Sequence, residues 1–320
     1  MRVVYFGSGD FAAPALRWLV NSRHEVPLVV TQPDRPAGRG KTLHSTPVAQ
    51  RAVAEGLTVL RCEHVNAPEV VERIRSLNAG LGVVAAFGQK LLEPLRRAFP
   101  LGCINLHASL LPKFRGASPI AGAILAGEKR TGVTVLRLVD RMDAGPILLK
   151  RETAIGPMET AGELHDRLAG IACDALGAAL DLLERDPGYG GEPQDELQAS
   201  HARKFKKSDG HLRFGEPAEQ LALRVRAMHP WPGARCRFVP AENGKAVELI
   251  LAAATAVPIT VPDPPGTITP VMTVATGQGT LEIHSVRPAG SREMSWQEFV
   301  SGRHVRPGDR LESVECGMEN

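Results

Sequence analysis

Five short, continuously apolar runs separated by amphipathic stretches occupy the first 150 residues. The runs are 3–6, 28–31, 83–86, 103–106 and 133–136, and helical patterns lie between them at 12–20, 47–54 and 68–77. Strands that are apolar on both sides and alternate with helices are typical of a parallel sheet covered on both faces. We therefore predict a Rossmann-like, mostly parallel α/β sheet, in which ligands bind beyond the carboxyl ends of the strands.

The pattern changes in the second half of the chain. A helix with a wide apolar face is expected at about 160–183. A Gly- and Pro-rich stretch follows and leads into the densest basic cluster of the chain, residues 201–207. Beyond a helical stretch near 217–228, short β-like segments alternate with Gly/Pro turns at 235–239, 247–251, 271–275 and 280–286. This alternation predicts a small, OB-like β-barrel.

These patterns predict two domains joined by a linker. The first covers 1–188, the basic linker covers 189–207, and the β-barrel domain covers 208–320. The net charge is only +3, so any nucleic-acid surface must be a local patch. Five cysteines without a C-x-x-C pair suggest neither a disulfide framework nor a zinc site. No apolar run approaches ~20 residues and no signal-peptide pattern opens the chain, so we expect no membrane segment and a cytoplasmic location.

The end of the fourth apolar run carries an unusual set of polar side chains. Asn105 and His107 stand at positions i and i+2 of an extended segment, so both point to the same face. Ser109, Leu110, Leu111 and Pro112 follow directly. Asp143, in the turn-like sequence Met-Asp-Ala-Gly, is a plausible orienting carboxylate for the imidazole. We expect Asn105 and His107 to lie at the carboxyl end of the sheet, whereas the nearness of Asp143 to His107 is inferred from the mechanism alone.

This set of residues fits acyl transfer from one nitrogen to another. The amide of Asn105 is a suitable donor to a tetrahedral oxyanion. His107 can move protons in both directions near neutral pH. Asp143 can hold the imidazole in one tautomer. None of these steps requires a metal or a covalent intermediate.

The same residues can also be interpreted in other ways. Ser109 could act as a covalent nucleophile, although such a serine needs a base within hydrogen-bond distance. Asp140 competes with Asp143 for the orienting role. A single His at a strand end can also be a satisfied loop residue, and an Asp before Ala-Gly can simply form a turn.

The sequence Gly7-Ser8-Gly9-Asp10-Phe11-Ala12 resembles a dinucleotide-binding fingerprint. Such a fingerprint also needs an acidic residue at the end of the second strand, to bind the ribose hydroxyls. Thr31, Gln32 and Pro33 stand there instead. We therefore interpret the glycines as a tight strand-to-helix turn, and a nicotinamide dehydrogenase as a weak competitor.

The sequence resembles the 10-formyltetrahydrofolate-dependent formyltransferase superfamily. The resemblance is carried by Asn-x-His at 105–107, by Ser-Leu-Leu-Pro at 109–112, and by the downstream Asp143, and it extends over nearly the whole chain. It implies that Asn105 polarises the formyl carbonyl, that His107 carries the proton and that Asp143 orients it. It also implies that residues 109–112 line the site of 10-formyltetrahydrofolate, with no metal involved.

Residues 31–41 resemble the basic loop with which one branch of this superfamily contacts the acceptor end of initiator methionyl-tRNA. The implied reaction is formyl transfer to the α-amino group of that tRNA by a monomeric enzyme. Arg35, Arg39 and Lys41 would then meet the phosphates of the tRNA. A second group of cations, Lys204, Lys206 and Lys207, could follow the acceptor-stem backbone.

Two residues depart from the family pattern: Phe87, where a Tyr is expected, and His229, where an Asn usually precedes Pro-Trp-Pro. Three rival functions remain on sequence grounds. The acceptor could be a sugar-nucleotide or purine-precursor amine, the acceptor could be water, or the chain could be a noncatalytic RNA-binding module. The basic loop and linker favour the tRNA acceptor, and the intact Asn, His and Asp set argues against the noncatalytic module.

Overall fold

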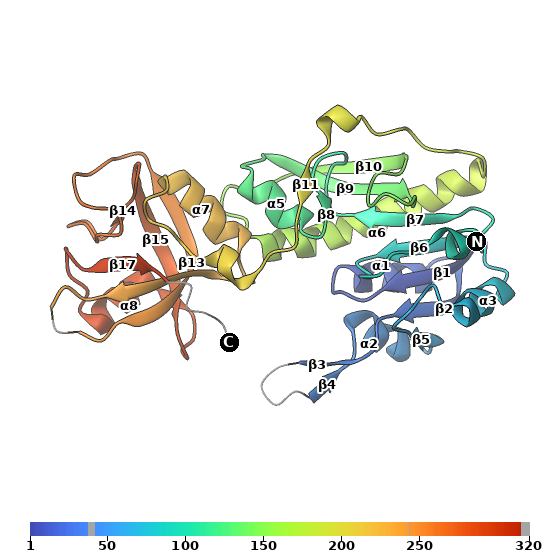
Figure 1. Cartoon of the computed structure of the whole chain (residues 1–320), viewed down its shortest axis with the longest axis horizontal. Coiled ribbons are helices and arrows are strands. Elements are labelled where there is room, and N and C mark those ends of the chain that lie inside the picture. Colours follow the sequence, from blue (N-terminus) through green and yellow to red (C-terminus); the bar gives the residue numbers. More distant parts are fainter. Residues whose placement is uncertain (38–41, 243, 315–320) are drawn as a thin grey trace. The chain divides into compact units, whose positions relative to one another are not determined.

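The computed structural model describes residues 1–37, 42–242 and 244–314, and its elements are labelled in Figure 1. The chain forms two compact units. The first comprises Met1–Pro119, Arg130–Ala154 and His165–Ala202, and the second comprises Ile120–Lys129, Ile155–Leu164 and the described residues from Arg203 onward. Residues 189–202 of the expected linker thus belong to the first unit. The domain boundaries at 188 and 207 remain a prediction.

A seven-stranded sheet forms the centre of the first unit, with the strand order β10-β9-β7-β6-β1-β2-β5. The strands are β1 (Arg2–Gly7), β2 (Glu25–Thr31), β5 (Val59–Arg61), β6 (Leu81–Ala85), β7 (Cys103–His107), β9 (Arg130–Arg137) and β10 (Ile147–Ala154). The five strands from β7 to β5 pair in parallel, and β9 runs antiparallel to both β7 and β10. The predicted Rossmann-like, mostly parallel sheet is confirmed.

Both faces of this sheet are covered by helices. Val4 and Phe6 of β1 belong to one apolar cluster with Val71 and Ile74 of helix α3. The alternate residue, Tyr5, points to the opposite face, where its hydroxyl donates to the carbonyl of Ala12 in helix α1 (2.6 Å). The helices of this unit are α1 (Ala12–Val20), α2 (Pro47–Ala54), α3 (Pro68–Ser76), α4 (Glu93–Arg96) and α6 (Ala161–Arg185), whose first residues belong to the second unit. Helix α5 (Pro119–Leu125) lies almost entirely in the second unit. Burial on both faces explains why the central strands read as continuously apolar.

Short elements complete the first unit. They are the hairpin of β3 (Arg35–Ala37) and β4 (Thr42–His44), the parallel pair of β8 (Arg115–Gly116) and β11 (His201–Ala202), and the 3-10 turn η1 (Glu196–Gln198). The β8–β11 pair joins residues that lie more than eighty positions apart in the sequence. It brings the segment before the second unit against the loop that follows β7.

The second unit contains an antiparallel sheet with the strand order β14-β15-β13-β12-β17, and β16 pairs with β15. Its elements are η2 (Lys207–Gly210), α7 (Ala218–Ala227), β12 (Ala234–Val239), β13 (Val247–Val257), β14 (Val274–Ala275), β15 (Thr280–Pro288), β16 (Met294–Ser295), α8 (Trp296–Arg303) and β17 (Arg310–Ser313). Thr267 bridges to β17, and the next residue, Ile268, bridges to β14. The two edge strands are thereby joined, and the predicted barrel-like fold is confirmed.

The core of this barrel contains three aromatic rings that contact one another. Phe238 of β12 meets Phe299 of α8 edge to face at 5.4 Å, and Trp296 stacks on Phe299 at 5.5 Å. Aromatic pairs at such separations contribute beyond the area that they bury. Within the described residues, no helix is both long enough and apolar enough to cross a membrane.

Helix α8 begins with a capping box that generates a pH-dependent prediction. Ser295 Oγ accepts the backbone N–H of Glu298 (3.1 Å), and the Glu298 carboxylate accepts the backbone N–H of Ser295 (2.7 Å). That backbone hydrogen bond holds the pKa of Glu298 below its ordinary value. A carboxyl whose pKa is lower in the folded state stabilises the fold above its unfolded pKa, and this contribution is lost as the pH falls through the folded pKa.

We therefore expect Glu298→Gln to lower the Tm at pH 7, and the difference from the parent protein to shrink as the pH falls below the ordinary pKa of a Glu and through the lower folded pKa of Glu298. Thermal unfolding followed by circular dichroism across this range checks the prediction. A Tm difference that is independent of pH would contradict it.

Candidate active site

Strand β7 carries Asn105 and His107 to the carboxyl end of the parallel part of the sheet. The strand lies between β6 and β9, so its end is flanked on both sides. His107 is 5% exposed, whereas Asn105 keeps partial access to solvent. As predicted from their i, i+2 spacing, the two side chains turn to the same region.

The imidazole of His107 is fixed by a backbone carbonyl. Its Nε2 lies 2.9 Å from the carbonyl oxygen of Phe114. Because a carbonyl oxygen can only accept, Nε2 must carry the proton of this hydrogen bond. In the neutral ring, Nδ1 is then the unprotonated nitrogen, and it lies 3.6 Å from Oδ2 of Asp143. The basic nitrogen of the ring therefore faces the carboxylate.

Asp143 joins the other two polar residues of this site. Its Oδ2 accepts the backbone N–H of Gly116 (2.9 Å), and its Oδ1 accepts the side-chain amide of Asn105 (3.5 Å). Its backbone is in the left-handed region, with φ 51°, and its side chain is 10% exposed. The structure thus brings together the three residues that the sequence analysis selected: Asn105, His107 and Asp143.

A run of three residues, 114–116, supplies the contacts that the sequence analysis missed. Phe114 provides the carbonyl for His107, and Gly116 provides the N–H for Asp143. Phe114 is in the left-handed region (φ 60°) although it is not a glycine. Gly116 has φ 116°, and a β-carbon there would lie 2.7 Å from the carbonyl of Ala202. In the sequence, this run follows closely after the Ser-Leu-Leu-Pro motif at 109–112, and that proximity is the signal that could have found it.

Residues 109–112 follow the strand and present mainly backbone and apolar groups. Ser109 is fully buried, and its hydroxyl donates to the carbonyl of Lys113 (2.7 Å) rather than to His107. Leu111 belongs to an apolar cluster. Leu110 and Pro112 keep partial exposure. Because the Ser109 hydroxyl donates to a backbone carbonyl and not to a base, this geometry does not support a nucleophilic role for Ser109.

Asp140, the alternative orienting carboxylate, lies elsewhere. It is exposed and accepts a hydrogen bond from Arg96 (2.8 Å). This hydrogen bond lowers the pKa of the Asp140 carboxyl. Asp140 thus forms an ion pair at the surface. The carboxylate that faces the imidazole is that of Asp143.

In the glycine turn after β1, backbone N–H groups form hydrogen bonds to another part of the protein. The backbone N–H groups of Ser8 and Gly9 both donate to the carbonyl of Ala86 (3.2 Å each). A β-carbon on Gly7 would lie 2.9 Å from Tyr5 and 3.0 Å from Ala12. The glycine is thus required by close packing, as the interpretation of a tight strand-to-helix turn expects.

The two residues that depart from the family pattern belong to different units. Phe87 is buried and meets Phe6 edge to face at 5.6 Å. His229 belongs to the second unit, where its carbonyl accepts the N–H of Gly162 (3.1 Å).

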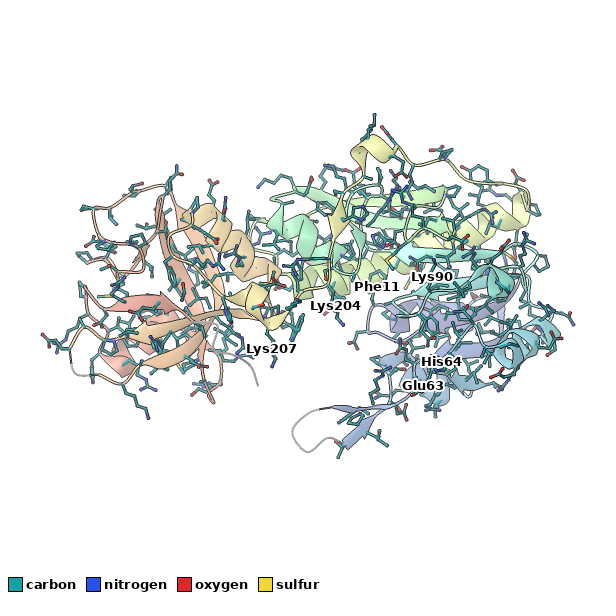
Figure 2. All side chains as sticks on the ribbon, viewed as in Figure 1. Phe11, Glu63, His64, Lys90, Lys204 and Lys207 are labelled. Atoms are coloured by element: carbon teal, nitrogen blue, oxygen red, sulfur yellow. The ribbon has the colours of Figure 1, made fainter. Side chains whose placement is uncertain are left out.

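The predicted basic groups fall in both units. Arg35 is exposed on β3, whereas Arg39 and Lys41 lie outside the described residues. The second group, Lys204, Lys206 and Lys207, is exposed at the beginning of the second unit, and Figure 2 labels two of these lysines on the segment after β11. Beside them, Arg203 pairs with Asp209 at 2.5 Å.

The turn that carries Asp143 depends on Gly145, because a β-carbon there would overlap the carbonyl of Arg137. We expect Gly145→Ala to destabilise the protein by about 1–3 kcal/mol, the usual cost of overpacking. The matched control is Gly190→Ala, where a β-carbon meets nothing within 4 Å. Denaturant unfolding compares the two variants. Equal stabilities would contradict the packing constraint at Gly145.

Comparison with known proteins gives a consistent result. A family described as "Formyl transferase" matches residues 1–180, and one described as "Formyl transferase, C-terminal domain" matches residues 204–304. Proteins named methionyl-tRNA formyltransferase are similar over nearly their whole length. The protein from Methylococcus capsulatus is 44% identical over 97% of this chain and 99% of its own. The protein from Heliobacterium modesticaldum is 40% identical over 97% of this chain and 100% of its own.

Among solved structures, HypX from Aquifex aeolicus in complex with tetrahydrofolic acid has a similar fold. The TM-score is 0.59 at 16% identity, and the match covers 94% of this chain and 48% of HypX. This chain therefore spans about half the length of that protein, and the likeness concerns the fold alone.

Proposed function

The chain belongs to the formyl transferase family, among the methionyl-tRNA formyltransferases, and from this membership we propose how its residues carry out the reaction. The enzyme transfers a formyl group from a folate donor to methionyl-tRNA. The donor is 10-formyltetrahydrofolate, and the acceptor is the α-amino group of the initiator methionyl-tRNA. The contacts among Asn105, His107 and Asp143 are the observation that carries this proposal.

Asn105 binds the formyl oxygen. An amide has two N–H donors, and one of them contacts Asp143 at 3.5 Å. The other donates to the formyl oxygen and stabilises the negative charge that develops when the amine attacks the formyl carbon. The carboxylate holds the amide in one orientation, so its donor is in place before the substrate binds.

His107 carries the proton between the two nitrogens. Its Nε2 proton is committed to the Phe114 carbonyl, so Nδ1 is the nitrogen that exchanges protons. As the amine attacks, a C–N bond forms and Nδ1 takes a proton from the attacking nitrogen. When the tetrahedral intermediate collapses, the bond between the formyl carbon and N10 breaks, and N10 receives the proton. No group is left covalently attached to the protein.

Asp143 stabilises the charged imidazolium between these two steps. Its Oδ2 lies 3.6 Å from Nδ1. Opposite charges at this separation attract most strongly in a site from which water is largely excluded, and both side chains are at most 10% exposed. The hydrogen bond from Gly116 keeps the carboxylate facing the ring.

Residues 109–112 form part of the wall of the folate site. Leu110 and Pro112 offer partly exposed apolar surface. Ser109 and Leu111 contribute through their backbone, since their side chains are buried. This combination suits a flat aromatic pterin, which needs apolar surface and a few orienting backbone groups.

The tRNA is bound through its phosphates by two basic groups. Arg35, Arg39 and Lys41 form the first, in the part of the sequence that follows β2. Lys204, Lys206 and Lys207 form the second, at the start of the unit that contains the barrel. Arginine and lysine bind phosphates by charge and hydrogen bonding without reading the sequence. We further propose that one chain acts alone, as a monomer in the cytoplasm.

His107→Ala should lower kcat for methionyl-tRNA formylation by about 10²–10⁴-fold, because the proton carrier is removed. The KM for both substrates should stay nearly unchanged. A direct assay combines the enzyme, 10-formyltetrahydrofolate and charged initiator tRNA, and follows formylmethionine. His64→Ala, at an exposed histidine outside the site, is the matched control. Wild-type turnover by the His107 variant would overturn its assigned role.

Binding of methionyl-tRNA should weaken steeply with salt, because phosphate contacts release counterions. Lys204→Ala should reduce the slope of log K against log salt by about 1 if this lysine neutralises one phosphate. Folate affinity should not change. Lys150→Ala, at an exposed lysine of β10, serves as the control. A slope identical to that of the parent protein would exclude Lys204 from the interface.

A further inference from the structure

The segment 192–202 crosses both loops that hold the proposed catalytic residues. Near its start, Glu192 pairs with Ile147 through two backbone hydrogen bonds of 2.8 Å. At its end, β11 pairs in parallel with β8. Ser200 contacts the same loop, because its hydroxyl accepts the N–H of Phe114 (2.9 Å). The segment therefore contacts residues 114–116 through its end, and it contacts Ile147, the first residue of β10 after the turn that carries Asp143, through its start.

Arg115 lies at the centre of this crossing. It is 1% exposed and is the largest fully buried side chain among the described residues. Its guanidinium makes four hydrogen bonds, two to Oε1 of Gln194 (3.1 and 2.8 Å) and two to the carboxylate of Glu196 (3.1 and 2.9 Å). A buried guanidinium is tolerated only when it is paired in this way. Residues 194 and 196 therefore determine where Arg115 can lie.

Gln194 extends this contact to the turn that carries Asp143. Its Nε2 donates to the carbonyl of Asp143 and to the carbonyl of Gly145, both at 2.8 Å. The orientation of the amide is unambiguous, because the two carbonyls can only accept and the guanidinium can only donate. One side chain thus bridges the two carbonyls of the turn and connects them to Arg115.

We propose that Gln194, Arg115 and Glu196 form a positioning group for formyl transfer, an inference that rests on the function proposed above. Arg115 lies between Phe114, which holds His107, and Gly116, which holds Asp143. Through Gln194 the same arginine is fixed to the backbone of Asp143. The group therefore sets the separation between the carboxylate and Nδ1 of the imidazole, although none of its side chains contacts either reacting group.

The sharpest test is Gln194→Glu. A carboxylate at this position keeps its acceptor for Arg115 but loses the two donors to the Asp143 turn. We expect kcat to fall about 10–100-fold, because displacements near 1 Å cost up to 10²-fold in rate. The KM values for 10-formyltetrahydrofolate and methionyl-tRNA should stay within about twofold, since this group contacts neither substrate. An unchanged kcat would overturn the proposal.

The matched control lies on the same segment. Gln198 donates to Asp195 (2.8 Å) and is exposed. Gln198→Ala should therefore leave kcat unchanged, whereas Gln194→Ala should lower it. Glu196→Gln tests the same group at a residue whose side chain is 48% exposed and whose amide oxygen can still accept a hydrogen bond from Arg115. A smaller loss of kcat, about three- to tenfold, is expected because a neutral acceptor still faces Arg115. Full activity of this variant would count against the group.

A double-mutant cycle separates positioning from general destabilisation. If Gln194 acts through Asp143, then Gln194→Glu should add almost nothing to the loss caused by Asp143→Asn. If Gln194 only stabilises the fold, the two losses should multiply, and that result would overturn the proposal. Full activity of Asp143→Asn alone would instead refute the role of Asp143 in the proposed function. Inactive Asp143→Asn with fully active Gln194→Glu would refute the positioning group alone.

Discussion

The hydrogen bond from His107 Nε2 to the carbonyl of Phe114 is the interaction on which the active site depends. In this hydrogen bond the proton on Nε2 is donated to a backbone carbonyl, and the other ring nitrogen, Nδ1, faces Asp143. The nitrogen that can exchange protons follows from this hydrogen bond, whereas Gly116 holds the Asp143 carboxylate and that carboxylate contacts Asn105. The parallel sheet contributes the second constraint, because it brings Asn105 and His107 to one strand end.

The loop after β7 and the segment 192–202 act together. Phe114 and Gly116 hold the two titratable side chains, and the intervening Arg115 is held in turn by Gln194 and Glu196. The part of the chain that completes this arrangement is also the part that leads into the second unit at Arg203. The basic cluster that is proposed to bind the acceptor therefore begins, in the sequence, immediately after the segment that contains the proposed positioning residues Gln194 and Glu196.

Much of the fold could be predicted from sequence because its signals are local. Continuous apolar strands separated by helices specify a two-sided parallel sheet, and short β-segments between Gly/Pro turns specify a barrel. The residue types of Asn105, His107 and Asp143 could also be selected, since their side chains match one reaction. Phe114 and Gly116 could not, because they act through backbone groups that every residue possesses. The role of Gln194 could not be predicted for another reason. A polar residue directly after a Gly- and Pro-rich stretch is interpreted as part of a linker, which is how the sequence analysis assigned it.

The protonation of His107 in the free enzyme tests this account most directly. In protein labelled with ¹⁵N-histidine, one signal among those of the ten histidines disappears in His107→Gln and identifies the residue. At a pH where the ring is neutral, the account predicts a proton on Nε2, with the one-bond ¹⁵N–¹H coupling there, and an unprotonated Nδ1. A proton found on Nδ1 would contradict the hydrogen bond to Phe114 and the proposed route of the proton.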